Sequence, residues 1–162
     1  MSDDGRFPYE IVSRWRVTGA MGEVYAVLTD AASLPRWWPE AYTKVTEIAP
    51  GDSRGCGRIS DIVTRGFLPY DVNWRLSVVE VNPPRMIRVI ATGDLSGEGE
   101  WRLEQEGGNV ALDYTWRVRV EKPWMQRLEF LLKPLFTINH NFVMGRGEAG
   151  LKRELARRAS GG

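Results

Sequence analysis

The sequence contains almost no thiol or imidazole chemistry. Its 162 residues include one cysteine, Cys56, and one histidine, His140. One cysteine excludes an internal disulfide and any cluster of cysteine ligands for zinc. We therefore expect no metal site and no cofactor, and we assign Cys56 no role.

The sequence also lacks an excess of charge of either sign and any long apolar run. Lysine and arginine number 22 against 21 aspartates and glutamates, which gives a net charge of +1. Because nucleic-acid binders need a basic excess to displace counterions, this balance excludes a dedicated one. The apolar stretches fall well short of the ~20 residues that span a bilayer, and the polar segment 1–7 does not resemble a signal peptide. We expect a cytoplasmic protein with no integral membrane association.

Aromatic and aliphatic residues, in contrast, are plentiful. Seven tryptophans occur in the chain, and hydrophobic residues make up 43% of it. A chain of this length buries roughly 70% of its unfolded surface, which is enough for one sizeable core. The composition predicts one globular domain over residues 1–162.

Period-two alternation of apolar and polar residues predicts seven strands joined by short turns. They cover residues 9–17, 42–48, 58–65, 70–78, 85–92, 97–104 and 110–120. Helical spacing over 20–29, followed by a short segment from Asp30 to Leu34, predicts two helices after the first strand. Successive strands with short connections are antiparallel, and their alternation leaves one face dry. The predicted class is α+β, with one strand, two helices, six strands and a terminal helix.

The C-terminal region predicts a long helix that covers the apolar face of the sheet. Pro134 suits a first helical turn, and the helical pattern continues to about Arg158. At 100° per residue, the side that carries Leu151 and Leu155 faces the sheet. The same side carries Phe136, His140, Val143 and Met144. The segment 124–132 before it is a short helix or an apolar loop.

A second apolar stripe lies on the opposite side of that helix. It consists of Leu135, Ile138 and Phe142. A helix that is apolar all round is buried on both sides, so another element must cover this stripe. Either the segment 124–132 or a partner chain in a homodimer would do so.

The inner face of the predicted sheet is nearly uncharged. Its polar candidates are Ser13, Tyr70 and Tyr114, and its tryptophans are Trp15, Trp74, Trp101 and Trp116. Two glycines on this face, Gly97 and Gly99, leave a void or admit a close neighbour. The strand 58–65 is ambiguous, because either the set with Asp61 or the set with Ser60 points inward.

A resemblance to a known family rests on three stretches of the chain. They are VLTDAASLPRWWPEAYTKV, GEWRLEQEGGNVALDYTWRV and NHNFVMGRGEAGLKREL. These stretches resemble the START-like, helix-grip superfamily, also called SRPBCC, and within it the polyketide cyclase/dehydratase type. The resemblance implies a sheet that curls round the C-terminal helix and leaves a deep cavity for a lipid, sterol, isoprenoid or polyketide. Some members are enzymes, and many are carriers or sensors.

The apolar inner face and this resemblance together predict that the cavity binds a hydrophobic small molecule. The predicted ligand-binding residues are Trp15, Trp37, Trp38, Tyr70, Trp74, Trp101, Tyr114, Trp116, Phe136, His140, Val143 and Met144. Trp37 and Trp38, bracketed by Pro35 and Pro39, either gate the cavity mouth or anchor their loop. The alternative for all these aromatic residues is plain core packing.

An enzyme is the main competing hypothesis. A cyclase or dehydratase needs a titratable group beside its substrate, and His140 is the best candidate, with Tyr114 as its partner in proton transfer. Tyr70 and Asp61 are weaker candidates, and the alternative for His140 is a core histidine bonded to a backbone carbonyl. A third hypothesis is a homodimeric interaction module that pairs through the second apolar stripe. We rank ligand binding first.

Overall fold

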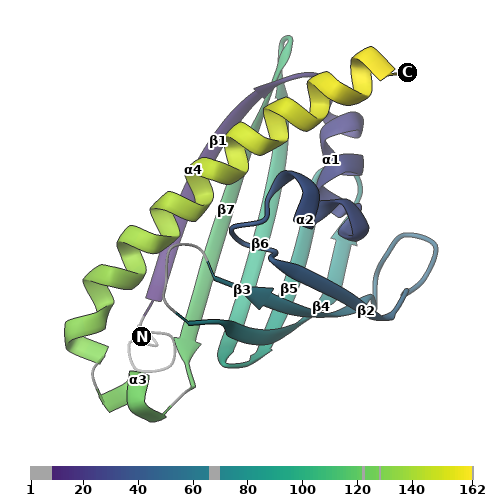
Figure 1. Cartoon of the computed structure of the whole chain (residues 1–162). Helices are drawn as coiled ribbons and strands as arrows, with labels where there is room; N and C mark the ends of the chain where they lie inside the picture. Colours follow the sequence, from purple (N-terminus) through teal and green to yellow (C-terminus); the bar gives the residue numbers. More distant parts are fainter. Residues whose placement is uncertain (1–8, 66–69, 122, 128, 162) are drawn as a thin grey trace, which may run out of the picture.

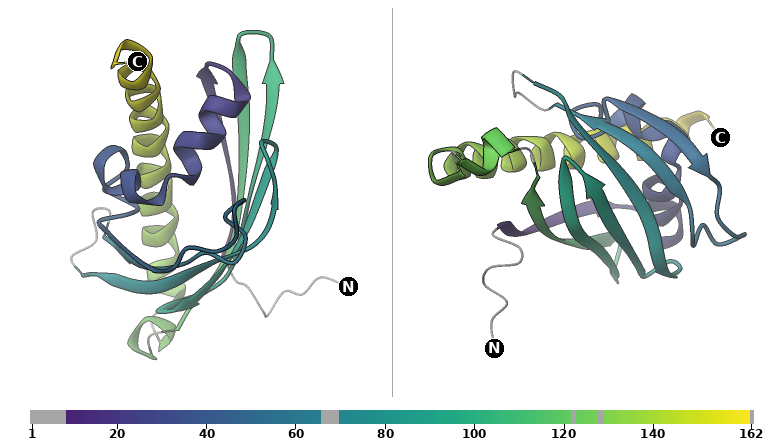
Figure 2. Two further views of the ribbon diagram at one scale, coloured as in Figure 1. Left: turned by 90° about the vertical axis from the view of Figure 1, so that its right-hand side faces the viewer. Right: turned by 90° about the horizontal axis from the view of Figure 1, so that it is seen from below.

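One strongly curved antiparallel sheet forms the frame of the molecule (Figure 1 and Figure 2). The computed structural model describes residues 9–65, 70–121, 123–127 and 129–161, and within them seven strands lie in the order β1-β7-β6-β5-β4-β3-β2. The strands are β1 (Tyr9–Thr18), β2 (Lys44–Ala49), β3 (Ile59–Thr64), β4 (Val72–Asn82), β5 (Met86–Gly93), β6 (Leu95–Glu106) and β7 (Asn109–Val120). All the pairings are antiparallel, as the short turns predict.

The helices lie on the concave side of this sheet. They are α1 (Met21–Thr29), the 3-10 helix η1 (Ala31–Ser33), α2 (Leu34–Trp37), α3 (Pro123–Arg127) and α4 (Glu129–Gly161). Figure 1 shows α4 running along the sheet, with α1 and α2 on the same side of it. This arrangement confirms the predicted α+β class and the helix-grip fold. Within the described ranges, no helix is long and apolar enough to cross a membrane.

The start of α4 differs from the prediction. Pro134 was expected in the first turn, but α4 begins at Glu129 and Pro134 lies inside it. A proline lacks the N–H that would bond four residues back, so inside a helix it removes one backbone hydrogen bond. Pro134 is the sixth residue of α4 and thus lies beyond the first four N–H groups, which have no helical partner in any case. The segment 124–132 is therefore divided between the short helix α3 and the first turn of α4.

The two glycines on the inner face of β6 admit close neighbours. A Cβ atom at Gly99 would lie 2.7 Å from Cε3 of Trp116 and 2.8 Å from the hydroxyl oxygen of Tyr114. A Cβ atom at Gly97 would lie 2.8 Å from the Cα atom of Val118. The missing side chains therefore let β7 and its aromatic rings approach β6, which resolves the two alternatives in favour of close packing.

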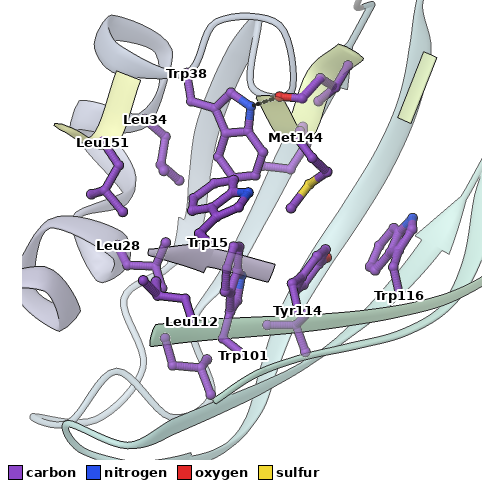
Figure 3. Close-up of a cluster of buried hydrophobic side chains, with 14 of the residues drawn as sticks. Trp15, Leu28, Leu34, Trp38, Trp101, Leu112, Tyr114, Trp116, Met144 and Leu151 are labelled. Atoms are coloured by element: carbon purple, nitrogen blue, oxygen red, sulfur yellow. Dashed lines mark hydrogen bonds between the residues drawn. The ribbon is translucent and has the colours of Figure 1, made fainter. Parts of the chain in front are cut away.

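Three tryptophans from separate elements form the centre of the core (Figure 3). The ring of Trp15 on β1 lies 5.1 Å from that of Trp38, which follows α2, and 4.9 Å from that of Trp101 on β6. Trp37 stacks on Trp38 at 5.7 Å, and its indole N–H donates to the Ser33 hydroxyl. Tilted and edge-to-face contacts at these distances add to the burial of apolar area. Trp15 and Trp37 thus pack within the core.

The second apolar stripe of α4 is only partly covered. Leu135 is half-buried and packs against the core, whereas Ile138 is 59% exposed and Phe142 37% exposed. The guanidinium carbon of Arg146 lies 5.5 Å from the centre of the Phe142 ring. The helix α3 therefore does not bury the outer part of this stripe, and the homodimer stays a prediction.

The orientation of β3 is also settled. Ser60 and Ile62 are each 2% exposed and face the helices. Asp61 points to the outer face, where its carboxylate accepts hydrogen bonds from Nε and Nη2 of Arg75 at 2.7 and 3.1 Å. The hypothesis of Asp61 as an acid or base inside the cavity is therefore wrong.

Candidate functional site

Two adjoining chambers lie between the sheet and the helices. The smaller has a volume of about 130 Å³ and the larger a volume of about 550 Å³, and both are partly open to solvent. Three side chains, Trp38, Tyr42 and Tyr114, line both chambers and form a wall between them. We call these three residues the aromatic partition.

The smaller chamber lies beside α4. Seven of the predicted ligand-binding residues line it: Trp38, Trp74, Tyr114, Trp116, His140, Val143 and Met144. Trp101 lines the larger chamber instead. Trp15, Trp37 and Tyr70 line neither chamber, and the side chain of Phe136 falls outside the part of the structure that is described. The ring of Tyr70 packs edge-on against that of Trp124 at 5.2 Å.

His140 faces the sheet, as the helical spacing predicts. Its Nε2 atom lies 3.3 Å from the hydroxyl oxygen of Ser13 on β1. Burial lowers the pKa of the imidazole to about 4, because the charged form loses its hydration. At pH 7 the ring is therefore neutral and offers one donor and one acceptor nitrogen.

Tyr114 is held between two tryptophan rings. Its ring stacks on Trp101 at 4.4 Å and on Trp116 at 5.7 Å, with interplanar angles of 24° and 22°. Burial raises the pKa of its phenol well above 10, and the nearby Tyr42 raises it further. Burial also raises the pKa of Tyr42 to about 12. Both phenols of the aromatic partition are thus protonated hydrogen-bond donors at neutral pH.

The larger chamber lies under α1 and the loop between β2 and β3. Its apolar wall includes Leu28, Leu34, Ile62, Leu76, Ile87 and Val89. The loop is held by Asp52, whose Oδ1 atom accepts from the backbone N–H groups of Arg54 and Cys56 at 2.8 and 3.0 Å. Arg54 and Arg58 also line this chamber. One chamber therefore combines an extended apolar surface with a polar end.

Two hydroxyl groups of this chamber have no hydrogen-bond partner among the described residues. They belong to Tyr25 on α1, which is 9% exposed, and to Ser60 on β3, which is 2% exposed. Sequence analysis missed Tyr25, because its position in the helical pattern is that of an apolar core residue. It named Ser60 as one of two alternatives for its strand. Only the folded chain brings the two, from α1 and from β3, into the lining of one chamber.

The described part of the chain holds no group of three or more histidine, cysteine, aspartate or glutamate side chains that could bind an ion. What the two chambers offer is apolar area, a few neutral hydrogen-bonding groups and two guanidinium groups at one rim. This combination suits binding of a small organic molecule.

Comparisons with known proteins agree with the fold. The family described as "Polyketide cyclase / dehydrase and lipid transport" matches residues 17–143. No curated protein matches the chain. Among solved structures, a START superfamily protein from Mycobacterium smegmatis is similar with a TM-score of 0.74 and 12% identity, covering 91% of this chain and 97% of that one.

Two enzymes are also similar in structure. The Zhui aromatase/cyclase from Streptomyces sp. R1128 has a TM-score of 0.69 and 15% identity, over 93% of this chain and 95% of that one. A point mutant of norcoclaurine synthase from Thalictrum flavum has a TM-score of 0.61 and 17% identity, over 93% of this chain and 96% of that one. At such identities the likeness establishes a shared fold.

Proposed function

The chain belongs to the polyketide cyclase/dehydrase and lipid transport family, and from that premise we propose that it binds a hydrophobic small molecule, such as a lipid, isoprenoid or polyketide-like compound, as a carrier or sensor. The binding site consists of the two chambers that adjoin at the aromatic partition. The similar structures include two that are named as enzymes and one that is named only as a START superfamily protein. Ligand binding is the property that a carrier and an enzyme of this fold would share.

The observation that carries this proposal is the larger chamber. Its volume of about 550 Å³ falls within the ~300–1,000 Å³ that is ordinary for ligand pockets. Removing roughly 300 Å² of apolar ligand surface from water would contribute about 7 kcal/mol before the costs of association. Micromolar binding needs a net gain of about 8 kcal/mol, so a larger buried area or hydrogen bonds of the ligand must supply the rest.

The test is a fluorescence titration with an environment-sensitive fatty probe, joined to native mass spectrometry of the gently purified protein. A matched pair of variants distinguishes the chamber from the surface. Val78 lines the larger chamber, and its neighbour Val79 is 43% exposed. Val78→Trp fills the chamber and should weaken probe binding at least tenfold, whereas Val79→Trp should leave it unchanged.

Two results would contradict the proposal. One is the absence of saturable binding by any amphiphile in a panel of lipids, isoprenoids and aromatic compounds. The other is equal binding by both valine variants while thermal melting shows that both are folded. The second result would place the probe outside the chamber.

Proton-transfer catalysis in the smaller chamber is a second candidate function. The observation that favours it is that His140 and Tyr114 line the same small space. At a pKa of about 4 the imidazole is neutral but a weak base, so it would accept the proton of a substrate hydroxyl group only as that proton is lost in the transition state. The protonated Tyr114 phenol would donate a hydrogen bond to a carbonyl oxygen that gains negative charge.

This second candidate is tested with a linear poly-β-ketone thioester mimic as substrate. His140→Phe should abolish formation of the cyclised or dehydrated product while binding of the mimic persists. Equal product formation by the wild-type protein and the variant would exclude His140 from the chemistry. Absence of product from the wild-type protein with a bound mimic would favour a carrier.

A further inference from the structure

The unpaired polar groups of the larger chamber come from α1 and from the chain that leads into β3. Nη1 of Arg58 donates to the carbonyl oxygen of Thr29 at 2.6 Å, and the Thr29 hydroxyl donates to the carbonyl oxygen of Tyr25 at 2.8 Å. The guanidinium group of Arg58 therefore lies under the last turns of α1, where Tyr25 is. Ser60 is the second residue of β3 and comes two residues after Arg58, which directly precedes that strand.

These groups are donors without acceptors. The hydroxyl groups of Tyr25 and Ser60 and the Nε atom of Arg58 are buried and make no hydrogen bond within the described ranges. The nearest carboxylate to that Nε atom belongs to Glu47, at 3.8 Å. Burying a hydroxyl group without a partner forfeits its hydration, so folded proteins rarely leave several such groups in one cavity. The missing acceptors are those that a ligand would bring.

We propose that the larger chamber binds an amphipathic carboxylate, whose carboxylate oxygens accept hydrogen bonds from Tyr25, Ser60 and Arg58. This inference rests on the proposed binding of a hydrophobic molecule and deepens it by naming the head group. The apolar chain or ring of the ligand then follows Leu28, Ile87 and Val89 toward the aromatic partition.

The electrostatics of the chamber favour a negative head group. Burial raises the pKa of the Tyr25 phenol, while the positive charges of Arg54 and Arg58 lower it, and the net effect is a rise. The phenol is thus a donor at neutral pH and lies within the field of both guanidinium groups. Arg58 is only 26% exposed at its side chain, so solvent screens its attraction for a carboxylate less than at an open surface.

Nearby negative charges leave this field in place. Asp52 lines the chamber and contributes one negative charge, against the two positive charges of Arg54 and Arg58, so the lining keeps a positive excess. Glu47 does not line the chamber, and its side chain is 52% exposed. A guanidinium group that pairs with a ligand carboxylate gains a stronger partner than Glu47 at 3.8 Å.

The experiment compares three probes of equal chain length: dodecanoate, dodecanol and dodecylammonium, titrated by calorimetry below their micellar concentrations. Dodecanoate should bind about tenfold more tightly than dodecanol, and dodecylammonium should bind most weakly. Tyr25→Phe and Ser60→Ala should each weaken dodecanoate binding at least fivefold and change dodecanol binding less than twofold. Arg102→Gln, which alters an exposed arginine on the outer face of β6, is the matched control and should change neither.

Stability gives a second readout that a structural role for these hydroxyl groups would not produce. Because the hydroxyl groups of Tyr25 and Ser60 have no partner in the unliganded protein, removing either one should leave the melting temperature unchanged or raise it. Weaker carboxylate binding together with an undiminished melting temperature is therefore the expected signature. A variant that melts much lower than the wild-type protein would show that its hydroxyl group stabilises the fold, and would overturn its assignment as a ligand contact.

The outcomes separate this inference from the proposed function. Equal binding of dodecanol and dodecanoate would overturn the carboxylate head group, with ordered water as the partner of the hydroxyl groups, and would leave hydrophobic binding standing. Preference for dodecylammonium would overturn it as well. Absence of saturable binding by all three probes, and by the wider amphiphile panel, would overturn both.

Discussion

The indole nitrogen of Trp38 lies 2.8 Å from the carbonyl oxygen of Val143, so the residue that follows α2 is hydrogen-bonded to the middle of α4. Figure 3 shows this bond above the buried aromatic rings. Since Trp38 belongs to the aromatic partition, the contact between α2 and α4 sets the boundary of both chambers.

Gly147 is the residue of α4 that makes this contact possible. A Cβ atom at Gly147 would lie 2.7 Å from Nε1 of Trp38 and 2.7 Å from Cη2 of Trp15. Gly147→Ala should therefore lower the free energy of unfolding by about 2 kcal/mol, as overpacking does. The measurement is the midpoint of urea unfolding.

Gly145 provides the control on the same helix. Nothing lies within 4 Å of a Cβ atom built there. Gly145→Ala should stabilise the protein by about 0.5–1 kcal/mol, because alanine is the better helix former. Stabilisation by both alanine variants would contradict the close approach of α2 to α4.

Glu154 is a buried carboxylate shared by three arginines. It is 3% exposed and accepts hydrogen bonds from Nη2 of Arg157 at 2.8 Å, Nη2 of Arg36 at 2.5 Å and Nε of Arg158 at 2.9 Å. These hydrogen bonds, of which the one from Arg157 has the largest effect, hold the pKa of the carboxyl well below its ordinary value of 4.5. Arg36 lies on α2, so the cluster also ties α2 to α4.

Glu154→Gln should therefore destabilise the protein by about 2 kcal/mol at pH 7. A carboxyl with a lowered pKa in the folded state stabilises that state above the pKa of the unfolded chain. Its contribution to stability is lost progressively as the pH falls below 4.5, the pKa of the carboxyl in the unfolded chain. The difference between wild type and variant should thus shrink between pH 6 and pH 3 in chemical unfolding. Glu104→Gln, at an exposed position, is the control; a difference that stays constant with pH would contradict the argument.

The burial of His140 makes the stability of the protein depend on pH over a higher range than Glu154 does. The pKa of His140 is about 4 in the folded protein and 6.5 without burial. Above pH 6.5 the imidazole is neutral in both the folded and the unfolded state. As the pH falls toward 4, only the unfolded state gains a proton. At pH 5 this linkage lowers the stability by about 2 kcal/mol relative to pH 8. His140→Phe should remove that loss, and NMR titration of the imidazole should give a midpoint near 4. A midpoint near 6.5 would contradict the burial of the ring.

The outer part of the apolar stripe on α4 predicts self-association. Two copies that pair through Ile138 and Phe142 would cover side chains that are 59% and 37% exposed. Sedimentation velocity should then show a dimer for the wild-type protein and a monomer for Ile138→Asp. Ile90→Asp changes an exposed isoleucine of β5 and should leave the dimer intact. A wild-type monomer at the highest soluble concentration would contradict this prediction.

The strands were predictable because alternation is a local property. In β7 the alternate residues from Val110 to Val120 are all buried, as their period predicts. In β3 both faces mix polar and apolar residues, so the sequence left Asp61 and Ser60 as alternatives. The choice depends on the register with β4, which sets Asp61 opposite Arg75. That cross-strand pair is not visible along the chain.

The chambers were harder to predict than the fold. Trp15 was correctly expected to point inward, but whether it lines a cavity depends on Trp38 and Trp101, which come from other elements and pack against it. Tyr25 looked like an ordinary apolar residue of its helix. An amphipathic pattern does not show whether a buried hydroxyl group has a hydrogen-bond partner. The character of this residue appears only in the folded chain, where Tyr25 lines the larger chamber with a hydroxyl group that is unpaired among the described residues.

The pairing of β1 with β7 has a consequence for biosynthesis. The partners run from Tyr9 with Val118 to Thr18 with Asn109, so about a hundred residues separate them along the chain. β1 is an edge strand of the described sheet, and its one neighbour there, β7, is translated about a hundred residues after it. A nascent chain must therefore carry an unpaired, tryptophan-bearing segment until β7 emerges, which exposes that segment to chaperones and to misassembly.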